Sequence, residues 1–134
     1  MRHAYGTVVL VIGLSFCLLT TWSSGATPEN FAARLGLRIA DPGGFNEIRA
    51  QYAGFFLAVG IVCAASLAGM LSRQASYVVL GTVFGGLILG RLASLAVDGG
   101  VSGYSPTIRT LYVVDAVGFA MSVAALVLDG PAGG

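Results

Sequence analysis

Four long apolar segments constrain this chain more than any other feature. Runs of about 18 or more apolar residues are typical of transmembrane helices, whereas strands of a membrane barrel need only about 9–11 residues. Backbone amides in lipid must be bonded within their own segment, which favours helices over isolated strands. The sequence therefore predicts an all-α, four-helix transmembrane bundle that runs up and down, with residues 1–134 as one integral membrane domain. The four expected spans cover about residues 4–22, 50–71, 75–97 and 108–128.

The composition agrees with a membrane protein and excludes other classes. Hydrophobic residues make up 56% of the chain and charged residues 10%, whereas soluble domains carry about 25% charged residues. Nucleic acid binding needs a concentrated basic surface. A net charge of +1 argues against such a surface. The expected partner is therefore the lipid bilayer, and no nucleic acid partner is expected.

The segment between the first two spans predicts a short amphipathic surface helix over about residues 28–40. Thr27 and Pro28 form a typical helix start, with threonine as N-cap and proline at the first position. Apolar residues then recur at a four-residue step, at Phe31, Leu35 and Ile39. The turn sequence that begins with Asp41 and Pro42 is expected to end this helix. Two roles are open: a helix packed over the mouth of the bundle, which we favour, and a lipid-sensing element.

Charge counting gives no clear orientation under the positive-inside rule. One membrane side carries the loop between the first and second spans and the loop between the third and fourth. This side holds five arginines and five acids, namely Arg34, Arg38, Arg49, Arg91, Arg109, Glu29, Asp41, Glu47, Asp98 and Asp115. The start Met1-Arg2-His3, followed directly by a span, resembles a signal anchor with its N-terminus inside. We therefore expect both termini to lie in the cytoplasm.

Two charges lie inside the expected spans at matching depth. Arg91 precedes Asp98 by seven residues, which places it about 10 Å below the surface. Asp115 follows Pro106 by nine residues, which gives about 13 Å in the neighbouring antiparallel span. A single charge in apolar surroundings is costly, so opposite charges at one depth are expected to pair.

We expect the polar residues near this end to form one cluster, made of Glu47, Arg49, Arg91, Asp98 and Asp115. One interpretation, which we favour, is a structural network that sets the register of the helices. The other is a ligand or proton site, where Arg91 binds an anion or a carbonyl group and Asp115 exchanges a proton.

No arrangement of residues indicates catalysis or a metal site. His3 is the one histidine, which argues against a haem, a zinc site or a serine hydrolase built by this chain alone. Cys17 and Cys63 are expected about 15 Å apart in depth, too far for a disulfide. We therefore expect a protein that is not an enzyme, with no cofactor other than a bound lipid or quinone.

Two stretches resemble a known family. They run from Gly44 to Phe55, GFNEIRAQYAGF, and from Gly90 to Gly99, GRLASLAVDG. These motifs are similar to those of the bacterial membrane proteins grouped as domain of unknown function 4345, over about residues 43–128. The resemblance implies four spans, the bacterial inner membrane and no settled activity. It also emphasises the motif charges, which are Glu47, Arg49, Arg91 and Asp98.

Two functions remain open from the sequence. We favour a non-catalytic accessory, scaffold or assembly subunit of a larger membrane complex, as a homo- or hetero-oligomer. Rows of small residues at a four-residue step support this, because they allow close packing of helices in lipid; one row is Gly86, Gly90 and Ser94. The alternative is a binder or carrier of a lipid, a quinone or another small hydrophobic molecule, with Arg91 and Asp115 at the closed end of its site.

Overall fold

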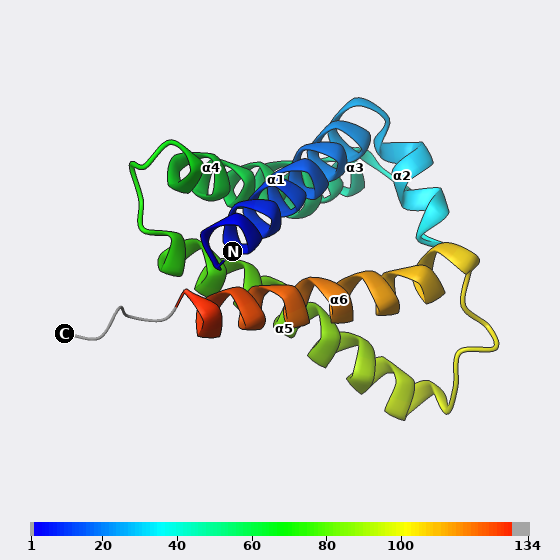
Figure 1. The fold of residues 1–134 in the computed structure, drawn as a ribbon. Helices are drawn as coiled ribbons and strands as arrows, with labels where there is room; N and C mark the ends of the chain where they lie inside the picture. Colours follow the sequence, from blue (N-terminus) through cyan, green and yellow to red (C-terminus); the bar gives the residue numbers. More distant parts are fainter. Residues whose placement is uncertain (1, 130–134) are drawn as a thin grey trace.

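The structure, a computed structural model, describes residues 2–129 and is entirely helical in its regular elements (Figure 1). The elements are α1 (Arg2–Ala26), α2 (Pro28–Arg34), α3 (Pro42–Ile48), η1 (Arg49–Gly54), α4 (Phe55–Leu67), α5 (Arg73–Asp98) and α6 (Pro106–Leu128). Because α3, η1 and α4 follow one another without a break, four helices are long and apolar enough to cross a membrane. This confirms the predicted all-α architecture with four membrane helices.

The four long helices form two antiparallel pairs. The segment η1–α4 packs along α1, and α6 packs along α5, with fewer contacts between the pairs than within them. The pairs meet near the chain termini and diverge toward the opposite end, where α2 lies beside the space between α1 and α6 (Figure 1).

The buried core lies mainly at the end where the pairs meet. Its side chains come from α1, α4, α5 and α6 and include Val9, Leu10, Cys63, Tyr77, Leu80, Phe84 and Ala125. The Tyr77 hydroxyl donates a hydrogen bond to the carboxylate of Asp129, at 2.7 Å. Gly6 of α1 faces this contact, and a Cβ at Gly6 would collide with the Tyr77 hydroxyl. A glycine is therefore needed for α1, α5 and α6 to converge here.

The helix that contains the second predicted span begins at Pro42, upstream of the predicted start of that span near residue 50. Asp41 does not end the surface helix as expected: its side chain accepts a hydrogen bond from the Gly44 amide at 2.9 Å and caps the new helix. Proline is well suited to the first helical position because its missing N–H has no partner there in any case. At the other end the helix stops at Leu67, because Gly69 adopts a left-handed φ of 74°.

The surface helix is shorter than predicted. It spans Pro28–Arg34 rather than about residues 28–40. Gly36 adopts a left-handed φ of 78°, and the amide of Leu37 donates to the carbonyl of Ala32 at 2.9 Å. This is the bonding pattern of a Schellman motif, in which a glycine ends the helix. The apolar spacing continued past the glycine, which is why periodicity alone misplaced the end.

A π-helical turn, η1, interrupts the second membrane helix at Arg49–Gly54. Such wide turns are rare and occur often at functional sites. The Thr21 hydroxyl donates to the carbonyl of Ala53 at 3.2 Å, which ties α1 to this turn. Tyr52 of the same turn packs against Phe31 of α2, with ring centroids 4.9 Å apart. The turn therefore connects the second membrane helix to both α1 and α2.

The register of α1 against α4 corrects the expected separation of the cysteines. A Cβ at Gly60 would lie 3.3 Å from the Cβ of Cys17, and a Cβ at Gly13 would lie 3.7 Å from the Sγ of Cys63. Gly60 and Cys63 are three residues apart, so the two cysteines differ in depth by about 5 Å, not about 15 Å. Both thiols are buried and free.

Candidate functional site

An ion pair joins α5 to α6 in the half of the bundle where the helix pairs diverge. Nε of Arg91 donates to Oδ2 of Asp115 at 2.5 Å, which confirms the predicted pairing. The side chain of Asp115 is 1% exposed and that of Arg91 is 18% exposed. Within residues 2–129 this is the one ion pair. A charged pair in apolar surroundings is stable only while both partners are present.

Tyr112 supports the arginine and was missed by the sequence analysis. Its hydroxyl donates to the backbone carbonyl of Arg91 at 3.0 Å, and the guanidinium carbon lies 5.6 Å from the centroid of the Tyr112 ring. The Tyr104 ring stacks on Tyr112 with centroids 6.2 Å apart. A signal was available, because Tyr112 precedes Asp115 by three residues and so lies on the same face of α6.

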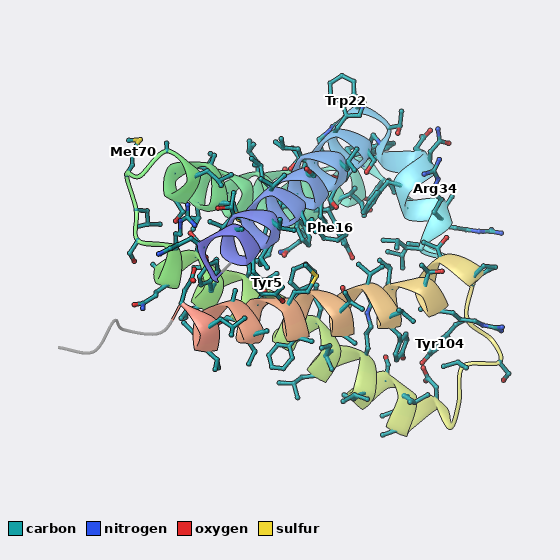
Figure 2. The ribbon with its side chains drawn as sticks, viewed as in Figure 1. Tyr5, Phe16, Trp22, Arg34, Met70 and Tyr104 are labelled. Carbon is teal, nitrogen blue, oxygen red and sulfur yellow. The ribbon has the colours of Figure 1, made fainter. Side chains whose placement is uncertain are left out.

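The ion pair borders a cavity of about 190 Å³ between the two helix pairs. We call it the polar cavity. Hydroxyl side chains, two arginines and aromatic rings line it, and α2 contributes Phe31 and Arg34. The lining residues include Thr20, Ser23, Arg34, Thr107, Phe16, Phe31, Tyr52, Phe56, Arg91 and Asp115. Figure 2 shows Arg34 on α2 at this end of the molecule, and Tyr104 on the loop between α5 and α6.

One oxygen of Asp115 has no hydrogen-bond partner within the described residues. This atom, Oδ1, is fully buried, whereas Oδ2 accepts from Arg91. Leaving a buried polar atom unpaired costs about 1–3 kcal/mol and more for a charged group. Among the described residues the Arg91 side chain donates to protein only from Nε, so its terminal NH₂ groups remain available as donors. Both residues of the pair line the polar cavity, Arg91 with free donors and Asp115 with one unpaired acceptor atom.

The other expected members of the cluster lie outside this pair. Asp98 accepts a hydrogen bond from the Tyr104 hydroxyl at the end of α5. Glu47 and Arg49 are exposed, and the Arg49 guanidinium lies 5.8 Å from the Phe45 ring centroid. The structure thus joins Arg91 to Asp115 but brings neither Glu47 nor Arg49 into an ion pair, because their helix packs along α1 rather than α5.

The bond between Tyr104 and Asp98 predicts a pH effect in the loop. The Asp98 carboxylate accepts a hydrogen bond from the Tyr104 hydroxyl and thereby raises the pKa of Tyr104 to about 12, with smaller contributions from burial and Tyr112. Because an unfolded tyrosine ionises near pH 10, this bond stabilises the loop below about pH 10, and the stabilisation is lost as pH rises toward 12. Near-ultraviolet absorbance of phenolate, compared between wild type and Tyr104→Phe, measures this pKa. Asp98→Asn should lower it toward 10, and an unchanged value would contradict the assignment.

Metal ligands do not gather in the described part of the chain. Among residues 2–129, no group of three or more His, Cys, Asp or Glu side chains is placed to hold a metal ion.

Four apolar membrane-length helices, two of them joined by an internal ion pair, define a polytopic helical membrane protein. Residues 5–126 match the family described as Domain of unknown function (DUF4345), and the chain belongs to this family. The match includes α1, which the two sequence motifs did not reach. No curated protein and no solved structure matches the chain.

Proposed function

We propose that this protein binds a small amphipathic molecule in the polar cavity, as a non-catalytic binder or carrier. The observation that carries the proposal is the buried Oδ1 atom of Asp115, which lacks a hydrogen-bond partner within residues 2–129 and belongs to a residue that lines the cavity. Buried polar atoms in proteins are nearly always paired, and each exception needs an explanation. A bound molecule with an O–H or N–H donor supplies the missing partner.

A purely structural role explains the ion pair less well. A register-setting salt bridge is most stable when both carboxylate oxygens are satisfied, since partial satisfaction leaves much of the desolvation cost in place. Here one oxygen bonds to Arg91 and the other has no protein donor. The aromatic walls formed by residues such as Phe31 and Tyr52 also suit an amphipathic molecule, because binding sites are mostly apolar with a few polar groups that fix orientation.

A route from the bilayer supports the same function. A groove of about 520 Å³ adjoins the polar cavity, and Tyr52, Leu87 and Arg91 line both. Gly86 and Gly90 of α5 also line this groove, and a Cβ at either position would meet no atom within 4 Å. Since neither glycine has a side chain to obstruct the groove, a molecule dissolved in the membrane reaches Arg91 from the side.

Native mass spectrometry of the protein extracted in mild detergent tests this proposal. We expect the wild type to carry a small molecule and Asp115→Asn to lose at least about tenfold in occupancy, the worth of one hydrogen bond to a charged group. Asparagine would turn its carbonyl toward Arg91 and present an NH₂ group to the cavity in place of an acceptor. The matched control is Asp98→Asn, which changes the same residue type outside the cavity. Equal occupancy in the wild type and Asp115→Asn, or no bound molecule in the wild type, would refute the proposal.

A second candidate function is the accessory, scaffold or assembly subunit predicted from the sequence. The observation that favours it is the open face of α5 at Gly86 and Gly90, because small residues let a helix of another subunit approach closely in lipid. The same spectra report any second protein chain. Gly90→Leu should remove such a chain, and a lone protein chain in every mild detergent would contradict this function.

We also propose that the protein lies in a bacterial inner membrane with both termini in the cytoplasm. The motifs that resemble those of bacterial membrane proteins support this location. Met1 and residues 130–134 lie outside the described residues.

A further inference from the structure

We infer that the ligand is a single-chain amphiphile whose head carries an O–H group, a carboxylic acid or an alcohol, and whose hydrocarbon chain lies in a second, apolar cavity next to Phe16. The inference rests on the proposed function and adds the chemical class and the position of the ligand. Three observations carry it: an apolar cavity, its position next to the polar cavity with Phe16 lining both, and the hydrogen-bonding groups at Asp115 and Arg91.

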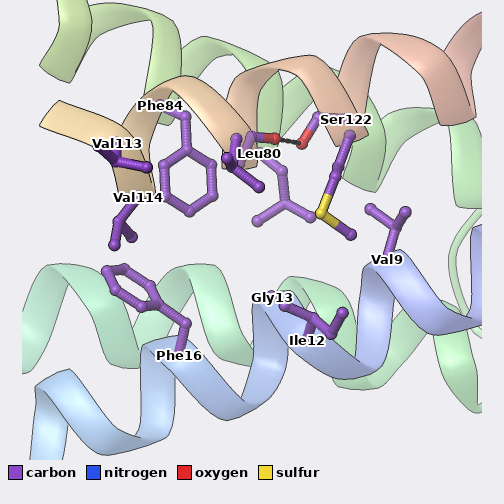
Figure 3. Close-up of a pocket in the computed structure, with 12 residues that line it drawn as sticks. Val9, Ile12, Gly13, Phe16, Leu80, Phe84, Val113, Val114 and Ser122 are labelled. Atoms are coloured by element: carbon purple, nitrogen blue, oxygen red, sulfur yellow. Dashed lines mark hydrogen bonds between the residues drawn. The ribbon is translucent and has the colours of Figure 1, made fainter. Parts of the chain in front are cut away.

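The second cavity has a volume of about 240 Å³ and lies between α1, α5 and α6 (Figure 3). Its one polar lining side chain is Ser122, whose hydroxyl donates to the carbonyl of Gly118 at 2.7 Å. The remaining lining is apolar and includes Val9, Ile12, Leu80, Val113, Val117 and Met121. Because its polar group is already bonded, this cavity offers space to a hydrocarbon chain but no hydrogen bond to a head group.

Phe16 lies between the two cavities, since it lines both. Its ring centroid lies 5.6 Å from that of Phe84 and 5.8 Å from that of Phe56. Figure 3 shows Phe16, Phe84 and Val114 at one end of the apolar cavity, and Ser122 at the other end. Asp115 follows Val114 directly in α6, so the head-group site lies next to the end of the apolar cavity that Phe16 occupies.

The hydrogen-bonding groups select the head. Oδ1 of Asp115 requires a donor, and the terminal NH₂ groups of Arg91 require an acceptor. An alcohol satisfies both with one oxygen, and a protonated carboxylic acid satisfies both with its O–H and its carbonyl. An ester accepts but donates nothing, and an ionised carboxylate would place a second negative charge beside Asp115.

The cavities select a chain by shape rather than by its hydrophobicity. A chain that moves from lipid into an apolar cavity exchanges one apolar environment for another, so its burial contributes little net affinity. The hydrogen bonds of the head therefore supply most of the affinity. The volume of the apolar cavity, about 240 Å³, favours one chain over the two chains of a diacyl lipid.

The test measures binding of decanoic acid, decanol and methyl decanoate to the full chain in detergent by native mass spectrometry. These probes share a chain, and only the ester lacks the O–H donor. We expect the acid, the alcohol or both to bind at least about tenfold more tightly than the ester, and their comparison identifies the head. In Asp115→Asn this preference over the ester should disappear, whereas in Asp98→Asn it should remain.

Variants of the apolar cavity test the position of the chain. Val114→Phe fills the cavity from α6, and Ile12→Phe fills it from α1 as a second variant in case the first fails to fold. Either should weaken binding of the preferred probe about tenfold. The matched control is Val127→Phe, since Val127 lies on α6, is 74% exposed and lines neither cavity.

Two results would overturn the inference. One is equal binding of the ester and the O–H probes to the wild type, and the other is unchanged binding in both cavity-filling variants. If another molecule binds in a manner that depends on Asp115 while these probes do not, the inference fails and the proposed function stands. If no molecule binds in that manner, both fail.

Discussion

Asp115→Leu is expected to lower the free energy of unfolding by about 3–5 kcal/mol, the usual cost of removing one partner from a buried ion pair. Arg91 keeps its charge at every accessible pH, and among the described residues it has no other acidic partner. The charge would then lie about 10 Å from the end of α5 in apolar surroundings. Reversible unfolding in mixed detergent micelles measures the loss.

The double variant Arg91→Leu/Asp115→Leu tests whether the unpaired charge of Arg91 causes this loss of stability. Removing both charges leaves no unpaired group, so we expect the double variant to recover most of the stability that Asp115→Leu loses. Glu47→Leu is the matched control because Glu47 is exposed and makes no ion pair, and its effect should stay within about 0.5 kcal/mol. A double variant no more stable than Asp115→Leu would contradict the view that an unpaired Arg91 is the cause.

Gly118→Ala is expected to lower the free energy of unfolding by about 1–3 kcal/mol through overpacking. A Cβ at Gly118 would lie 2.8 Å from three atoms of the Phe84 ring. That ring is 6% exposed and packs against Phe16, so a shift away from the new Cβ would disturb this packing. Thermal unfolding in detergent measures the change.

Gly86→Ala supplies the control for Gly118→Ala. It makes the same substitution in a membrane helix, but its Cβ would meet no atom within 4 Å. Alanine is the better helix former by about 0.5–1 kcal/mol, so this variant should be neutral or slightly stabilising. Equal destabilisation by the two variants would mean that loss of glycine itself, rather than contact with Phe84, is responsible.

The positions of the helix ends show where sequence patterns were insufficient. Apolar length identified all four membrane helices, but Asp41 and Pro42 were interpreted as an end when they begin the next helix. Gly36 ended α2 early through its left-handed conformation, although the apolar spacing continued. Whether a glycine or proline at such a position ends or begins a helix depends on the local backbone conformation. The sequence alone allows several conformations there.

The candidate site was predicted in part. The predicted depths of Arg91 and Asp115 in the membrane were enough to pair them. Two opposite charges at one level of neighbouring membrane helices have few other charged partners. Depth could not assign Glu47 and Arg49, since residues at one level can face different neighbours. Their helix packs along α1, which places them away from the pair.

The sequence by itself determined the class of this protein. Backbone amides exposed to lipid are costly unless they are hydrogen-bonded, so four long apolar segments form four membrane helices. The sequence also determined that Arg91 and Asp115 would pair. Only the tertiary structure decided that the helix pairs diverge, that a cavity lies between them and that Phe16 lies between it and a second one. It alone showed that one oxygen of Asp115 lacks a protein donor in the described chain. The physical reason is that the pattern of hydrophobic residues along the chain determines how deep each residue lies in the membrane. The direction of each side chain depends instead on how the helices pack.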